Sequence, residues 1–166
     1  YTHAFTDQLA WSTTFNYTRG DGFYENYKAG KSFSKYLMAD PVIDGVTYDE
    51  GDFITKEALA NDYFVLNTDL RYTSDILNIT GGVNLSRYDG DHIGSVLWSN
   101  VLGDSFDYDG HEWYLNRGLK HEASAFVRGE VTCFDGFTAF ADLQYRGVWL
   151  AMSGPEDDGV LLDHDE

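Results

Sequence analysis

The side chains best suited to holding a small molecule are six aromatic residues in stretches without regular periodicity. A tyrosine or tryptophan offers a flat apolar ring for stacking and a polar group for hydrogen bonding. Loops often carry binding residues, because they lie at the surface. We therefore predict a ligand-binding surface made from Tyr24, Tyr27, Tyr36, Trp98, Trp113 and Tyr114. The alternative is that these rings pack the loops against one another.

The acidic stretch DSFDYDGHE partly resembles a calcium-binding loop. Asp107, Asp109 and Gly110 fit positions 3, 5 and 6 of an EF-hand loop. However, Ser105 stands at position 1, and Asn116 stands where the bidentate glutamate belongs. Asp107 and Asp109 are thus weak candidate ligands for Ca²⁺, and a solvated acidic loop is the alternative. We expect no other cofactor.

Motifs for catalysis are missing from the sequence. It contains neither a G-x-S-x-G nucleophile elbow nor a G-x-x-x-x-G-K-[ST] phosphate loop. The 28 acidic residues are so numerous that the proximity of any two carries no catalytic information. Only 11 basic residues and a net charge of -17 argue against nucleic acid as a partner, because a polyphosphate requires a basic surface. We expect neither an enzyme nor a nucleic-acid-binding protein.

Two hairpins provide the strongest structural signal. Over residues 61–88, apolar and polar side chains alternate in two arms around the turn TSD. Residues 119–149 show the same alternation around the turn TCFDG. Pairing Leu70 with Ile79 and Leu66 with Val83 collects the apolar residues on one face. With the first alternating stretch, this predicts strands near 8–17, 61–72, 76–88, 119–131 and 137–149, and long loops at 18–60, 89–118 and 150–166.

The fold class predicted from these strands is all-β. Residues 1–166 form an antiparallel up-and-down meander of about five long strands with long loops at one end. Short turns that alternate with long loops are typical of transmembrane β-barrels, as are aromatic residues near strand ends. The charged side chains opposite the apolar face would then line a water-filled lumen. The alternative is a soluble antiparallel sheet with one wet face, which has the same alternation.

Several pieces of the sequence, in the expected order, resemble the barrel region of TonB-dependent outer-membrane receptors. The likeness is closest to the cobalamin and iron-chelate receptor group of Bacteroides-type bacteria. The pieces are GDGFYENYK, NDYF, GGVNLSRYDGDHIG and ADLQYR, and the likeness spans residues 8 to about 154. The resemblance implies a barrel of about 22 strands with a plug, located in the bacterial outer membrane. It also implies import of a scarce small molecule bound at the extracellular loops, with outer-membrane lipid around the barrel.

The chain departs from that plan, with about five predicted strands and no plug, TonB box or signal peptide. Closing a barrel takes about eight strands. We therefore predict a barrel fragment, whose partners are the rest of the receptor or another copy of itself. The alternative function is a soluble β-sandwich module that binds a ligand or carbohydrate. The alanines of the second hairpin argue against a sandwich, because they would fill little of its core: Ala123, Ala125, Ala139 and Ala141.

Overall fold

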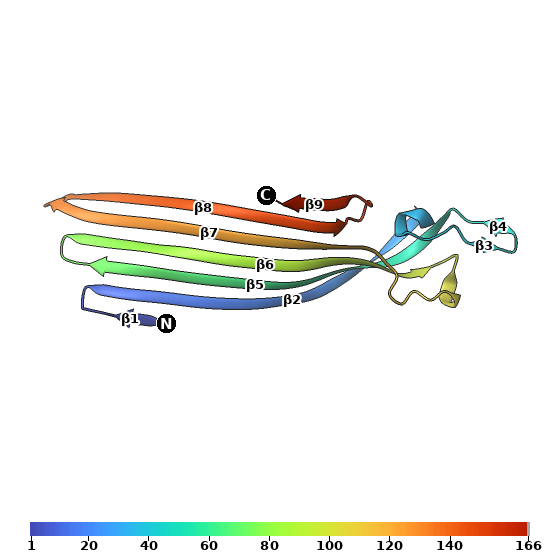
Figure 1. Ribbon diagram of the computed structural model, residues 1–166, viewed down its shortest axis with the longest axis horizontal. Helices are drawn as coiled ribbons and strands as arrows, with labels where there is room; N and C mark the ends of the chain where they lie inside the picture. Colours follow the sequence, from blue (N-terminus) through green and yellow to red (C-terminus); the bar gives the residue numbers. More distant parts are fainter. Residues whose placement is uncertain (166) are drawn as a thin grey trace. The chain divides into compact units, whose positions relative to one another are not determined.

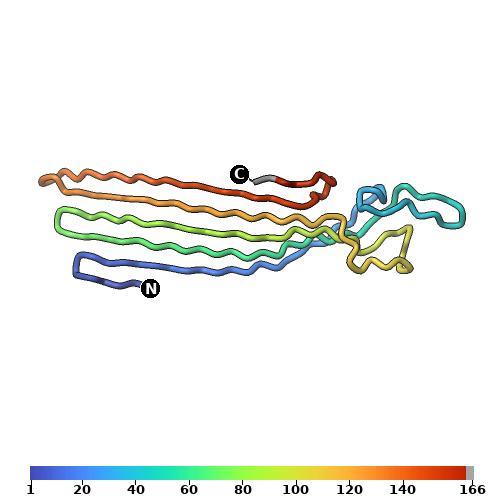
Figure 2. The backbone as a smooth tube through the Cα atoms, in the orientation of Figure 1, coloured from blue at the N-terminus to red at the C-terminus, as the bar shows by residue number. Residues whose placement is uncertain are grey.

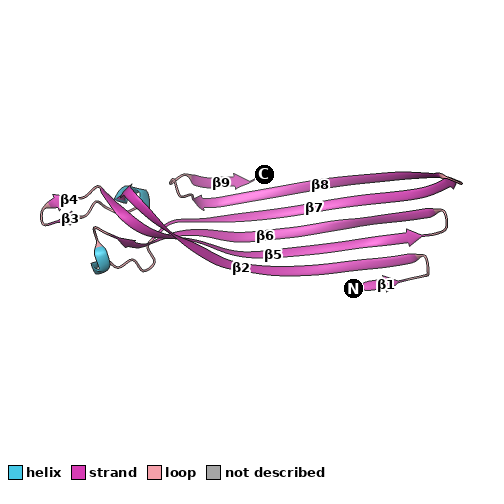
Figure 3. Ribbon diagram, turned by 180° about the vertical axis from the view of Figure 1, so that it is seen from behind, coloured by secondary structure: helices cyan, strands magenta, loops and turns pink. Residues whose placement is uncertain are grey.

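The computed structural model describes residues 1–165, and β-strands dominate them (Figure 3). Two short 3-10 helices interrupt the connections, η1 at Phe33–Tyr36 and η2 at Gly103–Ser105. The strands are β1 (Thr2–Ala4), β2 (Leu9–Ser32), β3 (Val42–Ile43), β4 (Val46–Thr47), β5 (Glu50–Thr73), β6 (Leu77–Ser99), β7 (Glu112–Phe134), β8 (Phe137–Pro155) and β9 (Leu161–Asp165).

The long strands form an antiparallel meander in the order β1-β2-β5-β6-β7-β8-β9 (Figure 1). The short β3 and β4 pair only with each other. Apart from that hairpin, each strand lies beside the strand that follows it in the sequence. The predicted all-β, antiparallel meander of long strands is therefore confirmed.

The strands are longer than predicted. The four strands β2, β5, β6 and β7 contain 24, 24, 23 and 23 residues. The predicted loops 18–60, 89–118 and 150–166 are therefore wrong over much of their length; the connections span residues 33–49, 100–111 and 156–160, with β3, β4 and the two 3-10 helices inside them. Alternation of apolar and polar residues reveals a strand only where one face is apolar and the other is wet. Aromatic and charged residues follow one another in these outer strand parts, so the period is lost although the backbone stays extended.

The chain divides into two compact units. Unit 1 comprises Tyr1–Thr18, Asp62–Tyr88 and Lys120–Leu150; unit 2 comprises Arg19–Asn61, Asp89–Leu119 and Ala151–Glu166. Unit 1 holds the three short turns, at residues 5–8, 74–76 and 135–136, and these lie at the same end of that unit (Figure 2). The predicted succession of short and long connections holds for residues 33–49 and 100–111, whereas the third connection, at residues 156–160, is short.

The β5–β6 hairpin has the predicted faces but a different register. Ser74 N donates to Leu77 O at 2.8 Å, which leaves two residues at the centre of the turn. A Cβ built on Gly82 would lie 3.0 Å from the Cβ of Asp69, and Asn84 Nδ2 donates to Asn67 Oδ1. Each residue of β5 therefore lies opposite a position two residues further along β6 than predicted. A shift of two keeps every side chain on its face.

One face of unit 1 is apolar. Trp11 Nε1 donates to Thr68 Oγ1 at 2.7 Å across this face, and the rings of Tyr17 and Phe64 stack at 4.8 Å. The face is largely exposed to solvent: Leu143 and Tyr145 expose 71% and 78% of their surface. Within residues 1–165, the strands of unit 1 belong to one sheet, so unit 1 supplies no second layer of its own.

The opposite face of unit 1 carries charged pairs between neighbouring strands. Arg146 Nη2 lies 2.7 Å from Glu122 Oε1, and Arg128 Nε donates to Asp142 Oδ2 at 3.0 Å. Lys120 adds a second cation to Glu122 at 3.2 Å. These residues alternate in sequence with the apolar ones, as predicted. The sheet of unit 1 therefore separates an apolar surface from a charged surface.

Unit 2 has a small aromatic core. Its members come from η1, the residues that follow it, and the outer parts of β5, β6 and β7: Phe33, Tyr36, Met38, Phe53, Val96, Trp113 and Tyr114. Phe33 and Tyr36 pack against Phe53, with ring centroids 5.0 Å and 4.6 Å apart. Leu37 ends η1 with φ of 58°, and Met38 N donates to Phe33 O at 3.0 Å. The turn thus folds the segment after β2 back onto the strands.

Gly94 is required for this core, because two aromatic rings occupy the space where a Cβ would lie. A Cβ on Gly94 would lie 2.2 Å from the Tyr114 ring and 2.7 Å from the Trp113 ring. The Tyr114 ring therefore lies directly over the backbone of β6. A side chain at position 94 would push the ring out of the core.

We predict that Gly94→Ala destabilises the protein by about 1–3 kcal/mol, the usual cost of overpacking a filled core. Thermal unfolding followed by circular dichroism measures the change. Gly118→Ala is the matched control on β7, because a Cβ there would meet no atom within 4 Å. The control should be neutral or slightly stabilising, since alanine loses less backbone entropy than glycine. Equal midpoints for the two variants would contradict the close contact.

Candidate functional site

Unit 2 contains a pocket of about 530 Å³ on adjacent strands β2, β5, β6 and β7. The volume lies within the range of small-molecule pockets, about 300–1,000 Å³. Its wall combines aromatic rings with ionisable groups: Gly20, Asp21, Gly22, Phe23, Tyr24, Glu57, Ala58, Leu59, His92 and Tyr114. Two of the six predicted ligand-binding aromatic residues, Tyr24 and Tyr114, are therefore brought together in one pocket.

Tyr24 and Glu57 join β2 to β5 in this wall. The Tyr24 hydroxyl donates a short hydrogen bond to Glu57 Oε2. This bond raises the pKa of Tyr24 above its ordinary value, and burial and the negative charge of Glu57 raise it further. At neutral pH the phenol thus remains a donor, and it holds the carboxylate of Glu57 at the pocket wall.

Tyr114 contributes a second protonated phenol. Burial beneath its neighbours raises the pKa of Tyr114 to about 12, and the negative charges of Glu57 and Asp157 act in the same direction. The ring takes this place because Gly94 has no side chain. The Tyr114 hydroxyl therefore stays neutral throughout the physiological pH range.

The described lining of the pocket is acidic. Asp21 and Glu57 are its carboxylate residues, and none of the described lining residues is a lysine or arginine. Lys56 lies close by, with its Nζ 4.3 Å from the centroid of the Phe23 ring. Most of the 28 acidic residues of the chain also belong to unit 2. The pocket is thus suited to a ligand that carries positive charge or donates hydrogen bonds.

The other predicted aromatic residues lie elsewhere. Tyr36 and Trp113 are buried in the core of unit 2, with ring centroids 5.1 Å apart, an arrangement of the kind given above as the alternative. Trp98 is half-buried on β6. Tyr27 is exposed, and its hydroxyl donates to Asp52 Oδ2 at 2.6 Å. That bond, together with the Gly30 N–H, lowers the pKa of Asp52. Ligand contact by these four residues stays a prediction.

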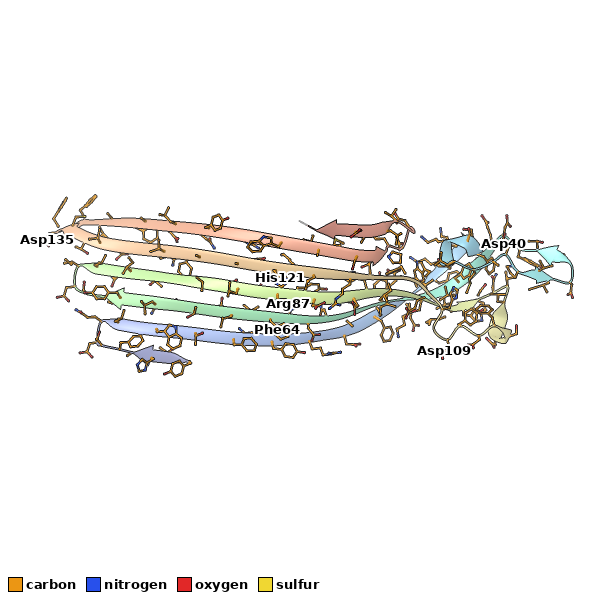
Figure 4. The ribbon with its side chains drawn as sticks, in the orientation of Figure 1. Asp40, Phe64, Arg87, Asp109, His121 and Asp135 are labelled. Atoms are coloured by element: carbon orange, nitrogen blue, oxygen red, sulfur yellow. The ribbon has the colours of Figure 1, made fainter. Side chains whose placement is uncertain are left out.

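The candidate calcium ligands lie in the connection between η2 and β7, where Figure 4 labels Asp109. Asp107 Oδ1 accepts a hydrogen bond from the Asp109 N–H at 3.0 Å, which stabilises a tight turn. Within residues 1–165, no three His, Cys, Asp or Glu side chains converge as metal ligands would. The turn accounts for the position of Asp107, and Ca²⁺ binding stays a prediction.

Sequence reasoning did not single out the ionisable residues of this pocket. Asp21, Glu57 and His92 stand among many acidic and polar residues in stretches that lack periodicity. The pairing of β2 with β5 is what places Tyr24 beside Glu57. The sequence predicts loops for the outer parts of both strands, and so it does not predict this pairing.

A smaller pocket of about 350 Å³ lies in unit 1. Phe64, Arg87 and His121 on β5, β6 and β7 line it, together with Phe15 and Trp149 (Figure 4). Here two basic side chains border the apolar face. This pocket lies where the apolar stretches of β6 and β7 end.

Comparisons of the chain with family models, curated proteins and solved structures found no match. Among the residues that the structure describes, no helix has the length and apolar character needed to span a membrane.

The raised pKa of Tyr114 predicts a loss of stability at alkaline pH. Between pH 10 and about 12 the unfolded chain gives up this proton and the folded protein keeps it. The unfolded state therefore binds fewer protons in that window, and the free energy of unfolding falls as the pH rises. Across this window, the midpoint of thermal unfolding should fall less for Tyr114→Phe than for the unmodified protein. Tyr63→Phe, at an exposed position, is the control and should follow the unmodified protein; identical slopes for all three proteins would contradict the assignment.

Proposed function

We propose that the chain is a segment of a β-barrel receptor of the bacterial outer membrane. The whole receptor would bind and import a scarce small molecule such as an iron chelate or cobalamin, in line with the resemblance to TonB-dependent receptors. The observation that carries the proposal is the uncovered apolar face of unit 1. In this proposal, lipid covers that face and the charged face looks into a water-filled lumen.

The extent of the apolar face fits a lipid bilayer. Its apolar positions run over residues 9–17 of β2, 64–72 of β5 and 77–85 of β6, which matches the roughly 9–11 residues that a tilted strand needs to cross the hydrocarbon core. Aromatic residues stand toward both limits of this stretch, as in the aromatic girdles of outer-membrane barrels: Trp11, Tyr17, Phe64, Tyr72, Phe137 and Trp149. Arg87 and His121 begin the more polar part beyond it.

The sheet edges also support a piece of a larger barrel. β1 pairs with β2 only from Thr2 to Ala4, and β9 pairs with β8 only over Leu161–Asp165. Among the described residues, much of the outer edge of β2 and of β8 therefore has backbone groups that are available to pair with further strands. In the proposed receptor, neighbouring barrel strands would pair with these edges.

The soluble β-sandwich is the competing function. A sandwich needs a second sheet against the apolar face, and the other sheet among residues 1–165 is the two-residue hairpin β3–β4 of unit 2. This favours lipid as the cover. The ligand would bind in unit 2, where the pocket with Tyr24, Glu57 and Tyr114 lies.

Light scattering of the 166-residue chain with and without detergent tests the proposal. We expect oligomers or aggregates in plain buffer and a discrete particle once detergent covers the apolar face. A clean monomer without detergent would overturn the assignment to lipid.

The neighbours Ile79 and Asn78 provide a matched pair on opposite faces of β6. In lipid vesicles, Ile79→Arg should destabilise the refolded chain by up to about 2–4 kcal/mol, because it places a charge against hydrocarbon. Asn78→Arg should have little effect, because its side chain lies on the charged face. Denaturant titration of the vesicle-bound protein measures both, and equal losses would contradict the assignment of the faces.

A further inference from the structure

The pocket of unit 2 combines a carboxylate with several aromatic rings. Glu57 is held in the wall by the Tyr24 hydroxyl, and Tyr24 and Tyr114 line the same cavity. A ring face attracts a cation through its quadrupole, and the attraction grows when water is excluded. Carboxylate and rings therefore act on the same kind of ligand.

An organic cation fits this pocket better than a metal ion. The cavity of about 530 Å³ is far larger than a single ion needs, and only two of the described lining residues, Asp21 and Glu57, carry a carboxylate. Within the described chain, no cluster of three metal-ligating side chains forms at this place. Apart from His92, the remaining wall is aromatic, aliphatic or glycine, which suits the alkyl groups of a substituted ammonium ion.

Anionic ligands are disfavoured by the same wall. The described lining residues include no lysine or arginine, and the Tyr24 phenol donates a hydrogen bond to Glu57. Lys56 lies over the Phe23 ring, so its ammonium group is already paired there. Lys35 forms an ion pair with Asp157, with its Nζ 3.7 Å from Asp157 Oδ2.

We propose that the unit 2 pocket binds a ligand with a substituted ammonium group, with Glu57 as its counter-ion and the rings of Tyr24 and Tyr114 as its aromatic wall. This proposal rests on the proposed receptor function and specifies the ligand class. An imported chelate or nutrient would then bear an alkylated or free ammonium group. The affinity would fall as salt is added, because charge attraction is screened.

Isothermal titration with choline and with its uncharged carbon analogue, 3,3-dimethylbutan-1-ol, tests the assignment in the detergent-solubilised chain. The two probes have the same shape and differ in charge. We expect saturable binding of choline, and binding of the alcohol at least about tenfold weaker. Equal affinities, or no saturable binding of choline, would overturn the proposal.

Substitutions at Glu57 locate the site. Glu57→Gln should weaken choline binding about tenfold, and Glu57→Asp, which keeps the charge, should retain more of the affinity. Glu112→Gln removes an exposed carboxylate of unit 2 outside the pocket and should leave the affinity unchanged. Circular dichroism verifies that each variant is folded. An unchanged affinity in Glu57→Gln, or an equal loss in Glu112→Gln, would contradict the assignment.

The two proposals can fail separately. Light scattering reports on the apolar face of unit 1, whereas choline titration reports on the pocket of unit 2. A chain that needs detergent but binds both probes equally would overturn only the ammonium ligand. A chain that is monomeric without detergent and still selects choline would overturn only the membrane assignment.

Discussion

The sheet of unit 1 is a single layer, and nothing in the described part of that unit covers its apolar face. The stability of the fold depends on what buries this face. Burial of apolar surface stabilises a protein by about 25 cal/mol per Å². Leu143 and Tyr145 contribute little of this stabilisation within the described chain, because most of their surface is exposed. A soluble domain obtains it by packing a second layer on the sheet. In the proposed receptor, lipid would supply it without interdigitating side chains, so small residues such as Ala125 and Ala141 would be acceptable there.

Unit 2 obtains its stability in a different way. Its strands share an aromatic core built around Phe33, Tyr36 and Phe53. The rings of Trp113 and Tyr114 complete the core and lie over the backbone of β6 at Gly94. The position of Tyr114 follows from the same glycine. One backbone feature of β6 therefore determines both how this unit packs and how a phenol reaches the neighbourhood of Glu57. A packed aromatic cluster also keeps the pocket wall in place before any ligand arrives.

The sequence predicted unit 1 better than unit 2. In unit 1, alternation of apolar and polar side chains identifies the strands, and the charged pairs Arg128–Asp142 and Glu122–Arg146 lie on the face expected for them. In unit 2, alternation is absent, so the sequence predicts loops where the structure has extended outer strands. Residue type alone could not distinguish Tyr36, which is buried in the core, from Tyr24, which lines the pocket. Only the neighbouring strand, which supplies Glu57, makes that distinction.

The two-residue difference in register between expectation and structure follows from the turn, where Ser74 N donates to Leu77 O and leaves only two residues between them. The hydrophobic pattern specifies the faces and leaves the register to the turn. An evolving sequence could therefore lengthen or shorten the turn after Thr73 by two residues and keep every apolar side chain on the same surface. A slip of the pairing by one residue would instead exchange the apolar and charged surfaces along the whole of β6. Slips of even length are thus the ones that preserve the two surfaces.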